Sequence, residues 1–157
     1  MHINGIFLSC KYKNTSMKKI FLTSLLIFTF FAIFAQSKDE AAIRKVMDAQ
    51  VTTWNDGNID NFMKTYWQND SLMFIGKSGI TYGWQHTLDN YKKNYPDKAA
   101  MGQLTFKLLE LKPLSSFYYF VVGQWHLQRS SDSLGGYFTL LFKKINGKWL
   151  IVADHSS

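Results

Sequence analysis

The side chain best suited to acid–base chemistry near neutral pH lies at the end of the sequence, GKWLIVADHSS. An apolar run over residues 149–153 precedes Asp154, His155, Ser156 and Ser157. Because successive strand residues point to opposite faces, we expect His155 to share a face with Ile151, and Asp154 to share the other with Val152. If Ile151 faces the interior, so does His155. We therefore predict His155 as the polar anchor of a pocket or as a general acid–base residue. A catalytically silent strand-end histidine remains the alternative.

Other chemistry-bearing patterns are weak. The histidines downstream of residue 35 are His86, His126 and His155, and no two of them have the i, i+4 spacing of helix-borne metal ligands. The sequence has no glycine-rich phosphate loop and no G-x-S-x-G elbow, and its single cysteine, Cys10, lies near the N-terminus. We predict no metal and no cofactor. Asp70 precedes a predicted strand, where a turn explains it without catalysis.

The N-terminal residues resemble an export signal. Met17-Lys18-Lys19 is followed by 16 uncharged, mostly apolar residues, 20–35. This pattern predicts a signal peptide over 17–35, cleaved after Ala35, since a membrane span needs about 20 residues. We then expect residues 1–16 to be an upstream extension from a start codon assigned too early, with an unusually long positively charged leader as the alternative. Residues 36–157 are expected to form a single exported domain, periplasmic or secreted, without a stable membrane anchor after cleavage.

Charge argues against a nucleic-acid partner. Four lysines and no acid lie in residues 1–35, so 14 basic and 11 acidic residues remain and the net charge falls from +7 to +3. The remaining basic residues are scattered, with no basic stripe of the kind that nucleic-acid binding requires.

The elements that would position these residues read as an α+β domain. A helix is expected over 37–56, with Gly57 at its end, a short helix from Asn58, a strand over 71–75 with its turn at 76–79, and a helix over 82–95. Four strands follow, over 102–112, 117–128, 136–145 and 148–155, and short connections favour antiparallel pairing. Along half of 117–128 the side chains expected on both faces of the strand are apolar, so both faces of the sheet should be covered there. Helices can cover one face, and we predict that a second copy covers the other in a homodimer through the sheet, with a monomer as the alternative.

The order of these elements and several short stretches resemble the SnoaL-like, DUF4440-type members of the nuclear transport factor 2 (NTF2-like) superfamily. The stretches are WNDGNID at 54–60, Phe62 and Tyr66, DSLMF at 70–74, GQW at 123–125, FTL at 138–140, GKW at 147–149 and DHSS at 154–157. The resemblance implies a cone-shaped α+β fold, with three N-terminal helices packed on a curved, mainly antiparallel sheet around a deep pocket, and often a dimer.

Aromatic residues make up 17% of the chain, and most of them must be core. From the resemblance and the helix faces, we predict as ligand-pocket residues Trp54, Tyr66, Tyr82, Tyr91, Trp125 and His155. The leading hypothesis is a pocket that binds a small apolar or aromatic molecule. One alternative is an enzyme of the ketosteroid isomerase, polyketide cyclase or dehydratase type using His155, and another is a non-catalytic interaction module. Fold does not decide among them.

Overall fold

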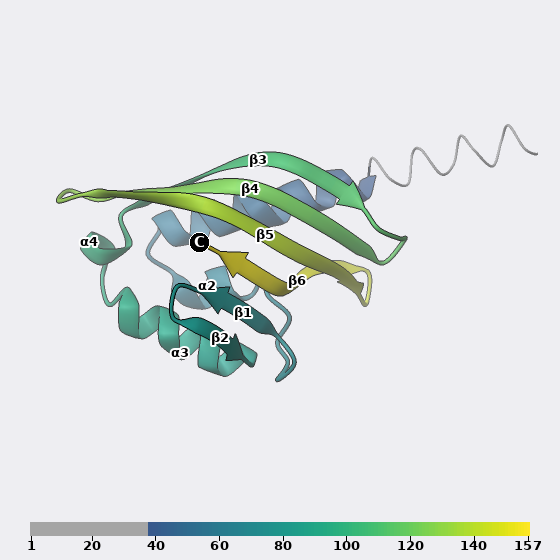
Figure 1. Ribbon diagram of the computed structural model, residues 1–157, viewed down its shortest axis with the longest axis horizontal. Coiled ribbons are helices and arrows are strands. Elements are labelled where there is room, and N and C mark those ends of the chain that lie inside the picture. Colours follow the sequence, from purple (N-terminus) through teal and green to yellow (C-terminus); the bar gives the residue numbers. More distant parts are fainter. Residues whose placement is uncertain (1–37) are drawn as a thin grey trace, which may run out of the picture. The chain divides into compact units, whose positions relative to one another are not determined.

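The computed structural model describes residues 38–157, and the predictions for the export signal and upstream extension lie outside them. Residues Gln36–Ser157 form one compact unit with its own core. This unit is an α+β domain in which helices cover one face of a curved sheet, as Figure 1 shows. The predicted fold class is therefore confirmed.

The N-terminal helix covers described residues 38–55. One face of this helix is buried, at Ile43, Met47, Gln50 and Trp54, because these positions recur every three or four residues. Gly57, at φ 78°, ends the turn that follows. Helix α2, Ile59–Met63, then begins at Asn58, whose side chain accepts a 2.9 Å hydrogen bond from the backbone N–H of Asn61.

Six strands form one sheet in the order β2-β1-β6-β5-β4-β3. Their bounds are β1 Met73–Gly76, β2 Gly79–Tyr82, β3 Gln103–Pro113, β4 Tyr118–Gln128, β5 Ser133–Ile145 and β6 Lys148–Ser156. All neighbours pair antiparallel except β1 and β6, which are parallel. The four long strands therefore lie where the sequence places them.

The region between β1 and β3 differs from expectation. The predicted helix over 82–95 is a strand end followed by α3, Trp84–Asn94, and a short helix α4, Lys98–Met101, was not predicted. The predicted turn at 76–79 is tighter than expected, because Gly79, at φ 101°, already begins the return strand in which Ile80 pairs with Ile75. Tyr82 ends that strand instead of starting a helix.

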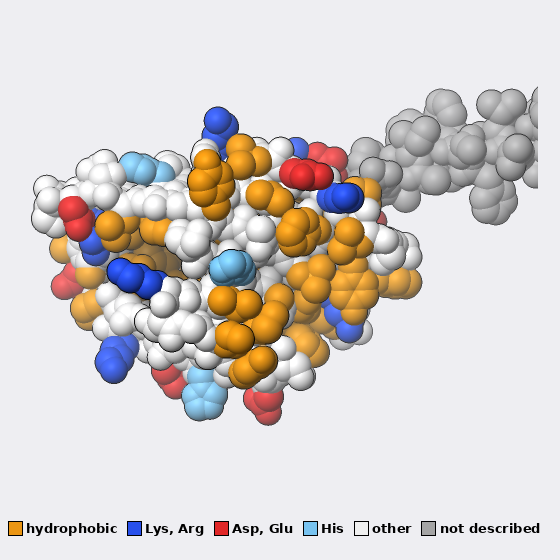
Figure 2. Space-filling view, in the orientation of Figure 1, with side chains coloured by type: hydrophobic (Ala, Val, Ile, Leu, Met, Phe, Trp, Pro, Cys, Tyr) orange, Lys and Arg blue, Asp and Glu red, His pale blue; other side chains and the backbone are white. Residues whose placement is uncertain are grey.

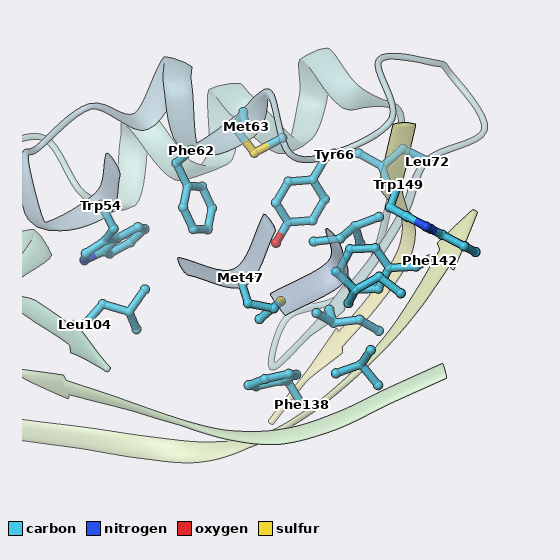
Figure 3. Close-up of a cluster of buried hydrophobic side chains, with 14 of the residues drawn as sticks. Met47, Trp54, Phe62, Met63, Tyr66, Leu72, Leu104, Phe138, Phe142 and Trp149 are labelled. Carbon is cyan, nitrogen blue, oxygen red and sulfur yellow. The ribbon is translucent and has the colours of Figure 1, made fainter. Parts of the chain in front are cut away.

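The core lies between the helices and the inner face of the sheet. Figure 3 shows Phe62 and Tyr66 pointing from the helical side into the core, with Phe138 and Phe142 of β5 across from them and Trp54 near Leu104. The outer face of the sheet carries apolar side chains that are only partly covered, among them Phe120, Val122, Leu141, Leu150 and Val152. Hydrophobic side chains are visible over these strands in Figure 2. No helix within residues 38–157 has the length and hydropathy needed to cross a bilayer.

Candidate functional site

A β-bulge in β6 decides which C-terminal side chain enters the domain. Ala153 pairs with Leu141 of β5, whereas Ile151 pairs with the next residue, Phe142, so Val152 is an extra residue on β6. The bulge shifts the alternation by one position. Ile151 is fully buried, and so is Asp154, which is 4% exposed, while His155 lies on the exposed side. The expected inward orientation of His155 is therefore wrong, and Asp154 occupies the interior in its place.

The segment after α2 brings a tyrosine to Asp154. The backbone N–H of Trp67 donates to the Ile151 carbonyl at 2.9 Å, and the Ile151 N–H donates to the Thr65 carbonyl at 3.1 Å. This short parallel bridge fixes Tyr66 beside β6. The Tyr66 hydroxyl donates a 2.7 Å hydrogen bond to Oδ2 of Asp154.

The second oxygen of the Asp154 carboxyl is also held. Ser156, two residues along the strand, donates from Oγ to Oδ1 at 2.7 Å. Burial raises the pKa of Asp154 from 3.8 to about 6, although the hydrogen bonds from Tyr66 and Ser156 and the charge of His155 act to lower it. The carboxyl therefore changes its charge within about one pH unit of neutrality, which suits a residue that binds or exchanges protons.

Two more polar side chains act on the Tyr66 hydroxyl: Gln50, whose Nε2 donates a 3.0 Å hydrogen bond to Oγ1 of the neighbouring Thr65, and Tyr91. Burial and the nearby Asp154 charge raise the pKa of Tyr66 well above its usual value, against a hydrogen bond from Gln50 that lowers it. Burial also raises the pKa of Tyr91 well above its usual value, and hydrogen bonding with Tyr66 opposes this shift. Both phenols therefore stay protonated at neutral pH. We name Gln50, Tyr66, Tyr91, Asp154 and Ser156 the tyrosine–aspartate site.

An aromatic cluster adjoins this site. It consists of Trp54, Phe62, Phe74, Tyr91 and Tyr95. Tyr91 is central, with ring centroids 5.3 Å from Phe62, 5.7 Å from Phe74 and 5.9 Å from Trp54. The Tyr91 hydroxyl reaches the tyrosine–aspartate site from this cluster. A polar group is thus presented at the end of an aromatic wall, which is the composition of a small-molecule site.

An open groove of about 610 Å³ reaches the same cluster from outside. Its apolar side is formed by Ile59, Tyr95 and Met101, and the Tyr95 ring stacks on Tyr91 at 6.1 Å. The rest of the lining is largely polar and charged: Asp56, Gly57, Asn58, Asp60, Lys92, Pro96, Asp97 and Lys98. The side chains of Tyr95, Tyr91 and Tyr66 therefore form a continuous series of contacts from the groove to Asp154.

The structure brings some of the predicted pocket residues together. Trp54, Tyr66 and Tyr91 lie in or beside the aromatic cluster. Trp125 packs against the core from β4, and its indole N–H donates to the Ser157 carbonyl at 3.2 Å. Tyr82 is 60% exposed at the end of β2, away from these contacts, because the predicted helix is a strand there.

The remaining sequence candidates are surface residues. Asp70, His86 and His126 are exposed, and His126 Nε2 lies 3.3 Å from the Ser133 hydroxyl. Within residues 38–157, His, Cys, Asp and Glu side chains form no group of three or more that is placed to hold a metal ion.

Three residues of the tyrosine–aspartate site, Gln50, Asp154 and Ser156, were not predicted from the sequence. The signal for Gln50 was present, because a polar residue stands on the otherwise apolar face of the first helix. For Asp154 the sequence pattern gave no such indication. Strict alternation places Asp154 on the same face as Val152, and only the bulge turns it towards the interior.

Together the fold and the site define an α+β domain whose curved sheet and helices enclose aromatic side chains around a buried carboxyl. The chain belongs to the NTF2-like superfamily. A crystallised relative from Shewanella oneidensis MR-1, an NTF2-like protein of unknown function, is 44% identical over 76% of this chain and 98% of that one, with a TM-score of 0.74.

More distant solved structures share the fold. A ketosteroid isomerase-like protein from Erwinia carotovora atroseptica SCRI1043 is 17% identical over 74% of this chain and 93% of that one, with a TM-score of 0.58. An NTF2-like superfamily protein from Salmonella enterica serovar Typhimurium LT2 is 18% identical over 78% and 92%, with a TM-score of 0.62. Comparisons with protein-family models and with curated proteins gave no match.

Proposed function

We propose that this domain binds a small apolar or aromatic molecule against the aromatic cluster, with the tyrosine–aspartate site as its polar anchor. The observation that carries the proposal is the buried carboxyl of Asp154, which receives hydrogen bonds on both oxygens. Placing an ionisable group in an apolar interior costs folding stability, and such groups concentrate at functional sites. The rings of Tyr91 and Tyr95 supply apolar contact beside it.

Native mass spectrometry of the protein purified from its own host tests this proposal. We expect a small molecule to remain bound and to be released on denaturation. Asp154→Asn should lower its occupancy at least tenfold, because a lost charged hydrogen bond weakens binding by about 1.5–3 kcal/mol. His155→Ala is the matched control, since it alters the exposed neighbour. Equal loss in both variants, or no bound molecule in the folded wild-type protein, would contradict the proposal.

A second candidate is acid–base catalysis in the same site. The pKa of about 6 for Asp154 is the observation that favours it, because a general base works best with a pKa near the operating pH. The tyrosine hydroxyls would donate hydrogen bonds to a substrate carbonyl as negative charge develops on its oxygen. In this second candidate the catalytic residue is Asp154, in place of the exposed His155. The ketosteroid isomerase-like neighbour shares only the fold.

A β,γ-unsaturated ketosteroid is a suitable first probe, since its isomerisation removes and returns a proton near a carbonyl and produces an absorbing enone. We expect a rate that rises with pH through about 6 and falls at least a hundredfold in Asp154→Asn. His155→Ala should retain the rate. Binding of the steroid without turnover would support the binding function alone.

We further propose that the domain is exported after cleavage behind Ala35 and pairs as a homodimer through the outer face of its sheet. The apolar pair Phe120 and Leu141, adjacent in register on that face, supports the dimer. Intact mass should show Gln36 first. Sedimentation of residues 36–157 should give a dimer at micromolar concentration, and Leu141→Lys should give a folded monomer. A wild-type monomer would contradict the interface.

A further inference from the structure

The turns at one end of the sheet form a surface that neither the aromatic cluster nor the groove explains. The β3–β4 turn exposes Leu114 and Phe117, which are 55% and 59% exposed. The β5–β6 turn lies beside it, because the Lys144 N–H donates to the Phe117 carbonyl at 2.9 Å and Tyr118 pairs with Lys143. We name this surface the strand-end tip, made of Lys112, Leu114, Phe117, Tyr118, Lys143, Lys144 and Lys148. Figure 2 shows hydrophobic side chains gathered at this end of the domain, on the right.

Lysines surround the apolar residues of the tip. Lys143 Nζ lies 5.7 Å from the Trp67 ring centroid and 5.6 Å from that of Tyr118, so its ammonium group makes cation–π contacts with both rings. Lys112 and Lys148 are exposed, and neither has an ion-pair partner among residues 38–157.

The neighbouring acids compensate only part of this charge. Asp39 is paired with Lys144 at 2.7 Å, and Glu40 with Arg44 at 2.7 Å, which leaves Glu110 as the exposed acid of the adjoining strand. The tip thus combines exposed apolar side chains, aromatic rings with polar edges and an excess of lysine. Amphipathic aromatic residues favour the boundary between lipid headgroups and acyl chains, and lysines are attracted to anionic headgroups.

The chain also enters the described domain at this end. Asp39 contacts both Lys144 and the Trp149 indole N–H, so the start of the first helix lies beside the tip, as Figure 1 shows. In the sequence, only residues 36 and 37 separate residue 38 from the apolar run 20–35. Two residues span about 7 Å at most. In the sequence, an apolar run therefore ends within two residues of the part of the domain that lies beside the tip.

We propose that the strand-end tip docks reversibly on the surface of an anionic lipid bilayer. Leu114 and Phe117 enter the headgroup boundary, while the lysines contact phosphate groups. This contact uses the ends of the strands. It borders the outer sheet face proposed for a second copy, because Lys112 of the tip pairs directly with Phe120 on that face. It is peripheral, so it requires no membrane-spanning element in the domain.

Co-sedimentation with vesicles tests the proposal, using residues 36–157, which form a compact unit without the apolar run. The vesicles contain equal parts phosphatidylglycerol and phosphatidylcholine, and phosphatidylcholine alone is the reference. We expect binding to the anionic vesicles that weakens with added salt. The double variant Lys112→Gln with Lys148→Gln should bind about 25-fold more weakly, because each lysine contributes about fivefold.

Matched variants at the other end of the domain separate position from charge. Lys77→Gln with Lys93→Gln removes the same charge from exposed sites on the β1–β2 turn and α3, and should change binding less than twofold. Leu114→Ala with Phe117→Ala should also weaken binding, whereas Ile80→Ala, at a site 56% exposed on β2, should not. Equal losses in tip and control variants, or no binding by the folded wild-type domain, would overturn the proposal. So would tip variants that alter only self-association, since the tip would then contact protein.

Discussion

Replacing Asp154 by Asn tests the tyrosine–aspartate site through stability alone, without a ligand. The carboxyl is buried, and its pKa is raised from 3.8 to about 6 in the folded protein. The folded state therefore binds this proton more tightly than the unfolded state. Below pH 3.8 both states are protonated and the group is neutral in each. As the pH rises towards 6, unfolding releases the proton and becomes more favourable, so stability falls. Above about pH 6 the loss is complete.

The size of the effect follows from the two pKa values. The difference between 3.8 and about 6 corresponds to about 3 kcal/mol, at about 1.4 kcal/mol for each pH unit. Asparagine cannot ionise, so the free energy of unfolding of Asp154→Asn should lack this component. The stability of the wild type relative to the variant should therefore drop by about 3 kcal/mol between about pH 3 and pH 7. Other carboxyl groups titrate in both proteins and cancel from the difference when they act independently.

Urea unfolding of residues 36–157 at a series of pH values measures this difference. With a urea slope of about 2 kcal/mol per molar, the wild-type midpoint should move by about 1.5 M relative to the variant. Asp70→Asn is the control, because it removes a carboxyl at an exposed site and should leave the wild-type pH dependence intact. A flat difference between wild type and Asp154→Asn would show that burial does not raise the pKa. A difference that grows with pH would show that the hydrogen bonds from Tyr66 and Ser156 outweigh burial.

Two further predictions concern individual contacts. Tyr66→Phe removes a hydrogen bond that lowers the pKa of Asp154, so this pKa should rise above about 6 in a carboxyl NMR titration. The free energy of unfolding should fall by about 1–3 kcal/mol. An unchanged pKa of Asp154 would refute the contribution of this hydrogen bond. Gly136→Ala should displace Ser157 and cost about 1–3 kcal/mol, because a Cβ there would lie 1.7 Å from the Ser157 carbonyl oxygen. Gly135→Ala, whose nearest contact is 3.2 Å, should cost less, and equal costs by urea unfolding would contradict the clash.

Much of this fold can be predicted from local sequence signals. The first helix is readable because its buried positions recur at helical spacing, and the long strands because apolar runs are separated by short polar turns such as Asn146-Gly147. The short strand β2 cannot be predicted from its sequence in the same way. Its four residues are almost all exposed, so no alternation of apolar and polar residues reveals that they pair with β1.

The site is harder to predict than the fold because it depends on one inserted residue. Alternation holds along β6 up to Ile151, and a register change of one residue exchanges the faces of everything beyond it. The bulge at Val152 is set by pairing with β5, a strand that lies elsewhere in the sequence. Without knowledge of that pairing, alternation along β6 places His155 in the interior. With the pairing known, Asp154 lies there instead.

The two proposed surfaces lie at opposite ends of the first helix, and this separates their tests. Asp39, in the first turn, contacts the β5–β6 end through Lys144, whereas Trp54, in the last turn, belongs to the aromatic cluster beside the groove. Their separation of 15 positions in the sequence corresponds to about 22 Å of helix. A bilayer at the strand-end tip therefore leaves the groove open to solvent. Loss of lysines at the tip should leave ligand occupancy unchanged, and Asp154→Asn should leave vesicle binding unchanged. If either variant impairs both, the two surfaces are coupled through the fold, and the assignment of separate sites fails.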